Sequence, residues 1–203
     1  MGMDATALGF FHESLFMADV STRFYGREMC ELGDQTLQLK GREKDPDRER
    51  TLAKVYFDRL GFNHTSIDIK GKRGSIPLDL SKPITDKRYL NRFDILTNFG
   101  TSEHVSNQFE CWRNIHNLVK SGGVFIHMVP LTLDEGNKKE ITGKHCDYCY
   151  MPKFFIKLAN SNFYKFYYGE LFVSHGSAGY CFRKYHTNKF QSTKEEIDSW
   201  VTT

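Results

Sequence analysis

The sequence predicts an α/β fold in which helices cover both faces of a doubly wound, mostly parallel seven-stranded sheet. Between residues 27 and 130, short extended segments alternate with segments of helical periodicity. The nearly continuous apolar run at residues 124–129 is typical of a strand that is covered on both faces. Beyond Pro152, two aromatic-rich segments flank a glycine-bearing turn, which predicts an antiparallel C-terminal hairpin at the sheet edge.

Length and composition predict one soluble domain at 1–203, with an N-terminal helical segment at 1–26 and an α/β core at 27–203. The hydrophobic fraction of 39% is ample for a packed interior. The net charge of +3, with basic and acidic residues interspersed, argues against a nucleic-acid partner. No apolar run approaches the roughly 20 residues of a membrane-spanning helix. Five scattered cysteines and a start without a signal-peptide pattern lead us to expect a cytoplasmic protein.

The first half of the chain predicts a helix, a strand, a surface loop, a second helix and a second strand. Leu8, Phe11 and Leu15 share one face of the first helix. The loop is dense in both charges, and Gly61 is expected to end the second helix as a C-terminal cap. These elements cover, in order, residues 8–20, 27–32, 39–50, 51–60 and 64–70.

The second half predicts the rest of the sheet and the helices that cover it. Val105, Phe109 and Trp112 share a face of a helix that Gly122 and Gly123 are expected to end. The expected elements are strands at 75–80 and 93–98, a helix at 105–119, a strand at 124–129, a helix near 154–158, and hairpin strands at 163–173 and 179–185.

Polar residues stand where the predicted parallel strands end. In open α/β sheets, the ligand lies beyond the carboxyl ends of the strands, where the strand order reverses. The strand ends carry Glu31 and Gly33, then Asp68, then Asp79, then Asn98. These hydrogen-bonding groups at one edge predict a nucleoside-shaped ligand.

The first loop selects among nucleosides. A dinucleotide site needs further glycines so that the backbone can approach a pyrophosphate, but Gly33 is followed by Asp34 and Gln35. A carboxylate just before the turn, Glu31, suits a cationic or amino-bearing ligand by Coulomb attraction. S-adenosylmethionine carries both a sulfonium and an amino group.

Several segments then carry a resemblance to a known family. They are ELG at 31–33, SIDI at 66–69, LDLSKPI at 78–84, FDILTNFGTSEHV at 93–105 with the following 107–130, and HCDYCYMPKFFIKLANSN at 145–162. Through these segments, the chain from residue 28 to the C-terminal hairpin resembles the class I S-adenosylmethionine-dependent methyltransferases of small-molecule type. The most specific segment is similar to the N-F-G-T-x-E-H run of bacterial members. The resemblance implies a Rossmann-like core and S-adenosylmethionine as cofactor.

The resemblance also implies the cofactor-binding residues. Asp68 would hold the ribose hydroxyls, Asp79 would meet the adenine amino group, and Leu80 would contact the adenine ring. The whole implied set is Glu31, Gly33, Asp34, Asp68, Asp79, Leu80, Asn98, Phe99 and Gly100.

One departure from the family pattern concerns the first loop, where Gln35 and Leu37 replace further glycines. Either the loop takes a tighter path around the methionine moiety, which the retained Asp68 and Asp79 favour, or cofactor binding has been lost.

Two histidines are candidate general bases, because methyl transfer to a hydroxyl requires a proton acceptor. We expect His104 and His145 at the carboxyl edge of the sheet, with His145 preferred; a hydrogen-bonded structural histidine is the alternative for each. Glu103 and Tyr150 are the candidate substrate-binding residues, although Glu103 also suits a helix N-terminus. His127, inside an apolar strand, is expected to be a core residue.

A metal site is not expected. The run His145-Cys146-Asp147-Tyr148-Cys149 contains one C-x-x-C motif and lacks the second ligand pair of a closed zinc site.

The resulting functional prediction is an enzyme that methylates a small polar acceptor, such as a sugar or related metabolite, on oxygen or nitrogen. Asn98-Phe-Gly-Thr101 differs from the clamp that methyltransferases use on exocyclic base amines, so DNA bases are disfavoured. We expect no membrane partner, and a homodimer stays open. The alternative is a catalytically inactive module of the same fold that binds a nucleoside or a protein.

Overall fold

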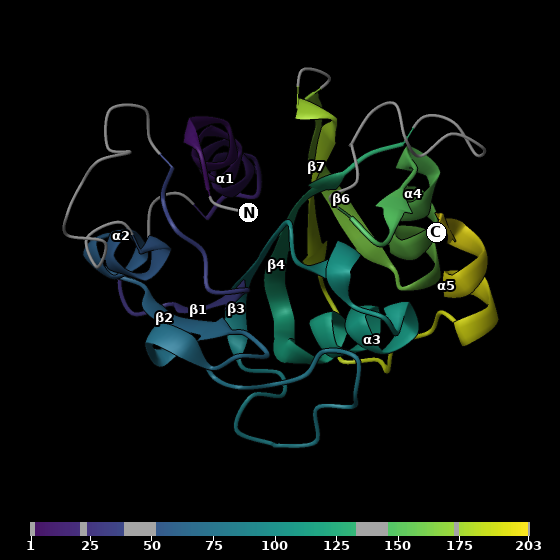
Figure 1. Ribbon diagram of the computed structural model, residues 1–203, viewed down its shortest axis with the longest axis horizontal. Coiled ribbons are helices and arrows are strands. Elements are labelled where there is room, and N and C mark those ends of the chain that lie inside the picture. The colour runs from purple at the N-terminus through teal and green to yellow at the C-terminus, as the bar shows by residue number, and fades with distance from the viewer. Residues whose placement is uncertain (1–2, 21–23, 39–51, 133–145, 173–174, 203) are drawn as a thin grey trace.

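A computed structural model describes residues 3–20, 24–38, 52–132, 146–172 and 175–202 of the chain (Figure 1). The charged loop predicted at 39–50 and the candidate base His145 lie outside these described residues.

The described strands form a six-stranded mixed sheet in the order β2-β1-β3-β4-β7-β6. The first four strands in this order run parallel, and β7 and β6 form the antiparallel edge, so the predicted doubly wound sheet with a C-terminal hairpin is confirmed. Strand order reverses between β1 and β3, which places a crevice at their carboxyl ends. The strands are β1 Glu28–Leu32, β2 Asn63–Ile67, β3 Phe93–Phe99, β4 Val119–Pro130, β6 Tyr164–Phe172 and β7 Ser177–Lys184.

The predicted number of seven strands in this sheet is one too many for the described residues. The expected strand at 75–80 is reduced to a single parallel bridge between Ile76 and Ile67. Pro77 has no N–H to donate to a ladder, and Asp79 instead accepts hydrogen bonds from Ser81 in a local turn. The segment therefore leaves the sheet after one residue.

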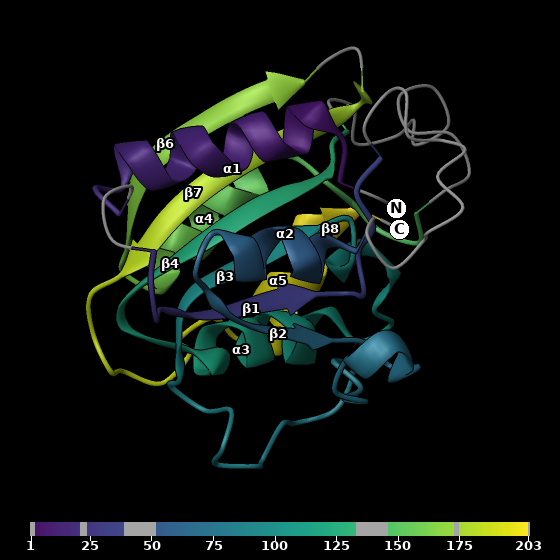
Figure 2. The same ribbon diagram turned by 90° about the vertical axis from the view of Figure 1, so that its left-hand side faces the viewer.

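Helices cover both faces of the sheet, as Figure 2 shows with α1 and α2 in front and α3, α4 and α5 behind. The helices are α1 Ala5–Met17, α2 Ala53–Arg59, α3 Gln108–Leu118, α4 Pro152–Ser161 and α5 Lys194–Trp200, with 3-10 turns η2 Lys72–Gly74 and η3 Ser102–His104. Strands β5 Cys149–Tyr150 and β8 Val201–Thr202 pair separately. None of the helices in the described part of the chain has the length and apolar character needed to cross a bilayer.

The helix predicted at 105–119 is shorter at both ends. Asn107 caps α3 by accepting from the backbone N–H of Glu110, so residues 102–104 form a separate turn. Strand β4 begins directly at Val119, and Gly122, at a φ of 83°, lies inside that strand instead of ending the helix. A short 3-10 turn at Ser102–His104, rather than the start of a helix, therefore follows β3.

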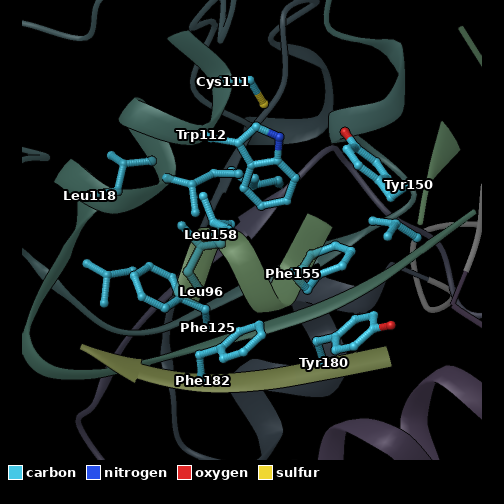
Figure 3. Close-up of a cluster of buried hydrophobic side chains, with 14 of the residues drawn as sticks. Leu96, Cys111, Trp112, Leu118, Phe125, Tyr150, Phe155, Leu158, Tyr180 and Phe182 are labelled. Atoms are coloured by element: carbon cyan, nitrogen blue, oxygen red, sulfur yellow. The ribbon is translucent and has the colours of Figure 1, made fainter. Parts of the chain in front are cut away.

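The core between the sheet and helices α3, α4 and α5 centres on Trp112 (Figure 3). The Trp112 ring lies 5.6 Å from the Tyr150 ring and 5.7 Å from the Phe155 ring, both edge-on. Its indole N–H donates to Gln108 Oε1 at 3.1 Å. His127 is buried in the same layer, and burial lowers its pKa to about 3, which agrees with the core histidine expected from the sequence.

Replacing Trp112 with alanine is expected to destabilise the fold by about 3–5 kcal/mol, because it removes a fully buried aromatic ring and one of the two donors to the Gln108 oxygen. Phe16, which is 69% exposed on α1, provides the matched control, and Phe16→Ala should change stability by less than about 0.5 kcal/mol. Urea unfolding of both variants measures the difference. Equal losses would show that Trp112 is not the centre of this core.

Candidate active site

A cavity of about 620 Å³ lies at the carboxyl ends of β2, β1 and β3, at the point where strand order reverses. Seven of the predicted site residues line it: Gly33, Asp34, Asp68, Asp79, Leu80, Gly100 and His104. The carboxyl edge of the sheet, where the sequence predicted a ligand, therefore carries a cavity of the size of a small-molecule site.

The turn after β1 forms the floor of this cavity. Gly33 has a φ of 80°, and a Cβ there would meet Gln35 Nε2 and Thr101 Oγ1, each at 2.7 Å. Its N–H donates to the Ile67 carbonyl at 2.8 Å. Only glycine fits this turn, which answers why the chain places one at the end of its first strand.

Asp68 and Asp79 occupy the β2 side of the cavity. Asp68 Oδ1 accepts from the Lys70 N–H at 2.8 Å, and Oδ2 accepts from the Asp34 N–H at 3.3 Å. Asp79 Oδ1 accepts from both the N–H and the hydroxyl of Ser81, and these bonds lower the pKa of Asp79. Asp79 is thus charged at neutral pH, and the backbone bonds fix the orientation of both side chains.

Asp34 lines the cavity, but its carboxylate has a cationic partner. Arg73 Nε donates to Asp34 Oδ2 at 2.6 Å, and Arg73 Nη2 donates to the Asp34 carbonyl at 3.0 Å. Arg73 reaches across from η2 with a φ of 50°. The charge of Asp34 is therefore balanced at the cavity rim.

Glu31 is 2% exposed and lies beneath the turn, not in the cavity wall. Its Oε2 is 3.4 Å from His64 Nε2, and the His64 ring stacks on Phe57. Burial raises the pKa of Glu31. The acid before the glycine thus supports the turn from below.

Asn98, Phe99 and Tyr150 are also buried behind the cavity. Asn98 holds Ser102 through its side chain, donating to Oγ at 2.8 Å and accepting from the N–H at 3.1 Å. The Tyr150 hydroxyl lies 3.0 Å from Ser102 Oγ and donates to Gln108 Oε1 at 2.7 Å. Phe99 packs in the core beneath α1 and α2. Tyr150 and Asn98 therefore position η3 and do not line the cavity.

His104 and Glu103 are neighbours in η3 with opposite environments. His104 is exposed and lines the cavity, with Nδ1 3.7 Å from Asp147 Oδ2. Glu103 is fully buried, and neither carboxylate oxygen has a hydrogen-bond partner among the described residues. Burial raises the pKa of Glu103 to about 7. His104 is thus the histidine that the described chain brings to the cavity.

Sequence reasoning missed Thr101, Arg73 and Asp147. Thr101 Oγ1 donates to the Leu32 carbonyl at 2.8 Å and so ties the ends of β3 and β1 together. The threonine stands in the NFGT run, so its position was visible but its partner was not. Nothing in the sequence links Arg73 to Asp34, 39 residues away.

The described residues contain no group of three or more side chains that could hold a metal ion. Cys146 Sγ and Cys149 Sγ lie 2.9 Å apart.

Comparisons with solved structures assign the fold. The chain is similar to 1,6-didemethyltoxoflavin-N1-methyltransferase from Burkholderia thailandensis, bound to 1,6-didemethyltoxoflavin and S-adenosylhomocysteine, with 14% identity over 89% of this chain and 82% of that one at a TM-score of 0.54. It is also similar to geranyl diphosphate C-methyltransferase from Streptomyces coelicolor A3(2), bound to Mg²⁺, geranyl diphosphate and S-adenosyl-L-homocysteine, with 8% identity over 85% and 79% of the two chains at a TM-score of 0.53.

A geranyl diphosphate methyltransferase in complex with sinefungin matches 85% of this chain and 77% of its own at 6% identity and a TM-score of 0.57. No protein-family model matches the sequence, and no curated protein is significantly similar to it. The fold is that of class I S-adenosylmethionine-dependent methyltransferases, as the resemblance implied.

The buried carboxyl of Glu103 predicts a pH dependence of stability. Between about pH 4.5 and pH 7, the folded chain keeps a proton on Glu103 that the unfolded chain has lost, so this group makes stability fall as the pH rises. Glu103→Gln should remove that fall and gain on the order of 3 kcal/mol relative to wild type between pH 4 and pH 8.

Urea unfolding at several pH values measures this effect, and Glu13→Gln on the exposed face of α1 is the control. An unchanged pH dependence in Glu103→Gln would mean that Glu103 is not the buried proton carrier.

Proposed function

We propose that the protein transfers the methyl group of S-adenosylmethionine to a small polar acceptor. The observation that carries this proposal is the cavity at the strand-order reversal, which Asp68, Asp79 and His104 all line. Solved structures of the same fold that hold S-adenosylhomocysteine support the choice of cofactor.

The residues of the cavity fit an adenosyl ligand. Leu80 is an apolar contact for an adenine ring, Asp79 is a charged acceptor for its amino group, and Asp68 has a fixed carboxylate for two vicinal hydroxyls. This order directs the reacting end of the ligand toward Gly100 and His104, on the β3 side. The acceptor would then enter beside His104.

S-adenosylmethionine, when bound, supplies a methyl group on a sulfonium, which departs as a neutral thioether. The chain therefore has to align the acceptor behind the methyl group and exclude water, and positioning accounts for most of the acceleration. If the acceptor is a hydroxyl, its proton must leave as the carbon–oxygen bond forms. His104 lines the cavity, and its Nδ1 lies 3.7 Å from Asp147 Oδ2, so the carboxylate can orient the ring while the imidazole accepts that proton.

The first test is cofactor binding by calorimetry. We expect micromolar-range affinity for S-adenosylmethionine and S-adenosylhomocysteine, and Asp68→Ala should weaken binding by roughly 1.5 to 3 kcal/mol because a charged bidentate acceptor is lost. Asp86→Ala is the control, since Asp86 pairs with Arg88 outside the cavity. Absence of binding to the wild-type protein, or full affinity in Asp68→Ala, would contradict the proposal.

The second test identifies the base, once an acceptor-library screen with mass detection has found a substrate. General-base assistance is worth roughly 10²- to 10⁴-fold in rate. If His104 is the base, single-turnover rates of His104→Ala should fall by that factor while affinity for S-adenosylhomocysteine changes little. The same single-turnover measurement on His145→Ala tests the other candidate base, which lies outside the described residues. Undiminished rates in both variants would fit an acceptor that is already deprotonated.

A module that binds an adenosyl ligand without turnover is the second candidate. Gln35 motivates it, because this side chain lines the cavity where further glycines are usual. Cofactor binding together with a negative acceptor screen would favour this candidate.

A further inference from the structure

Gln35 has a fixed place in the cavity wall. It is 5% exposed, and it belongs to the turn between β1 and α2. Its backbone carbonyl accepts from the N–H of Ala53 at 3.1 Å, which anchors the residue to the first turn of α2. The side chain folds back over Gly33, whose missing Cβ leaves room for it.

The contacts of the Gln35 amide determine which end faces which neighbour. Nε2 lies 3.4 Å from the Leu32 carbonyl and 3.4 Å from Thr101 Oγ1. The carbonyl can only accept, and the Thr101 hydroxyl already gives its proton to that same carbonyl. Both neighbours therefore need the donor end, so the amide nitrogen faces them and Oε1 points elsewhere.

Oε1 is a buried acceptor without a hydrogen-bond partner in the part of the chain that the structure describes. Such a group is costly to bury unless something donates to it. The two acids nearest the turn already have cationic or imidazole partners. Arg73 donates to the Asp34 carboxylate, and the buried Glu31 carboxylate lies against His64. The neutral Gln35 oxygen is thus a buried acceptor without a partner among the described residues, in a side chain that lines the cavity.

We propose that Gln35 Oε1 accepts a hydrogen bond from the ammonium group of the bound ligand, and so makes Gln35 the residue that selects for the amino-acid part of an S-adenosyl compound. The proposal rests on the proposed function and deepens it. With adenosine at Asp68 and Asp79, the aminocarboxypropyl chain leaves the ribose toward the β1–β3 junction, where Gln35 and Thr101 meet. Gln35, which replaces a glycine of the family pattern, would then contact the ligand directly.

The test compares three probes with the same adenosine, using calorimetry on the full chain. S-adenosylhomocysteine has the amino and carboxylate groups, S-adenosyl-3-thiopropylamine has the amino group alone, and 5′-methylthioadenosine has neither. Gln35→Met keeps the length of the side chain and removes its polar atoms. Gln38→Met, an exposed position on the same turn, is the matched control.

Gln35→Met should weaken both amine-bearing probes about tenfold or more and leave 5′-methylthioadenosine within about twofold of wild type. Gln38→Met should leave all three affinities unchanged. Equal loss for the three probes would show that Gln35 only supports the turn. Loss for S-adenosylhomocysteine alone would point to the carboxylate as its partner, and unchanged affinities would show no ligand contact; each of these results overturns the proposal. Failure of the wild-type protein to bind any adenosyl probe is a separate result that removes the proposed function itself.

Discussion

The site depends on the junction where β1 and β3 end side by side. Thr101 Oγ1 donates to the carbonyl of Leu32, the last residue of β1 before the chain turns at Gly33. This one bond holds the two strand ends together on either side of the strand-order reversal. The turn, the Gln35 side chain and the cavity floor all take their positions from it. A Cβ at Gly33 would displace the threonine and the glutamine together, so the glycine and the bond require each other.

Behind the cavity, a buried polar network gives the 3-10 turn after β3 a single position. Asn98 holds Ser102, Tyr150 bridges Ser102 and Gln108, and Gln108 accepts from the Trp112 indole. A fully bonded network in a low-dielectric interior resists rearrangement, because any shift leaves a buried group unpaired. The same turn carries His104 on its exposed side. The aromatic core around Trp112 thus fixes a histidine at the cavity without touching it.

Periodicity predicted the sheet, the helices and the edge hairpin, because apolar faces of period two and 3.6 can be recognised without tertiary contacts. The strand at 75–80 was not predictable as a single bridge, since the competing turn depends on Asp79 bonding to Ser81. For the site, polar residues at strand ends identified Asp68, Asp79 and Gly33 as cavity residues. Burial separated Glu31 and Tyr150 from the cavity wall, and only the packed structure contains that information.

The electrostatics of the turn also decide which nucleotides the cavity can hold. A pyrophosphate site needs free backbone N–H groups at the turn and at the next helix N-terminus. Here the Gly33 N–H is used by Ile67, the Asp34 N–H by Asp68, and the Ala53 N–H at the start of α2 by Gln35. These three backbone donors are therefore used within the protein. The cavity lining carries Asp68 and Asp79 together with Lys70, and Lys82 pairs with Asp79 at 3.2 Å. With these backbone donors already used, a pyrophosphate would lack the N–H groups that usually bind it, whereas the sulfonium and ammonium groups of the proposed cofactor need acceptors such as Asp68 and Asp79.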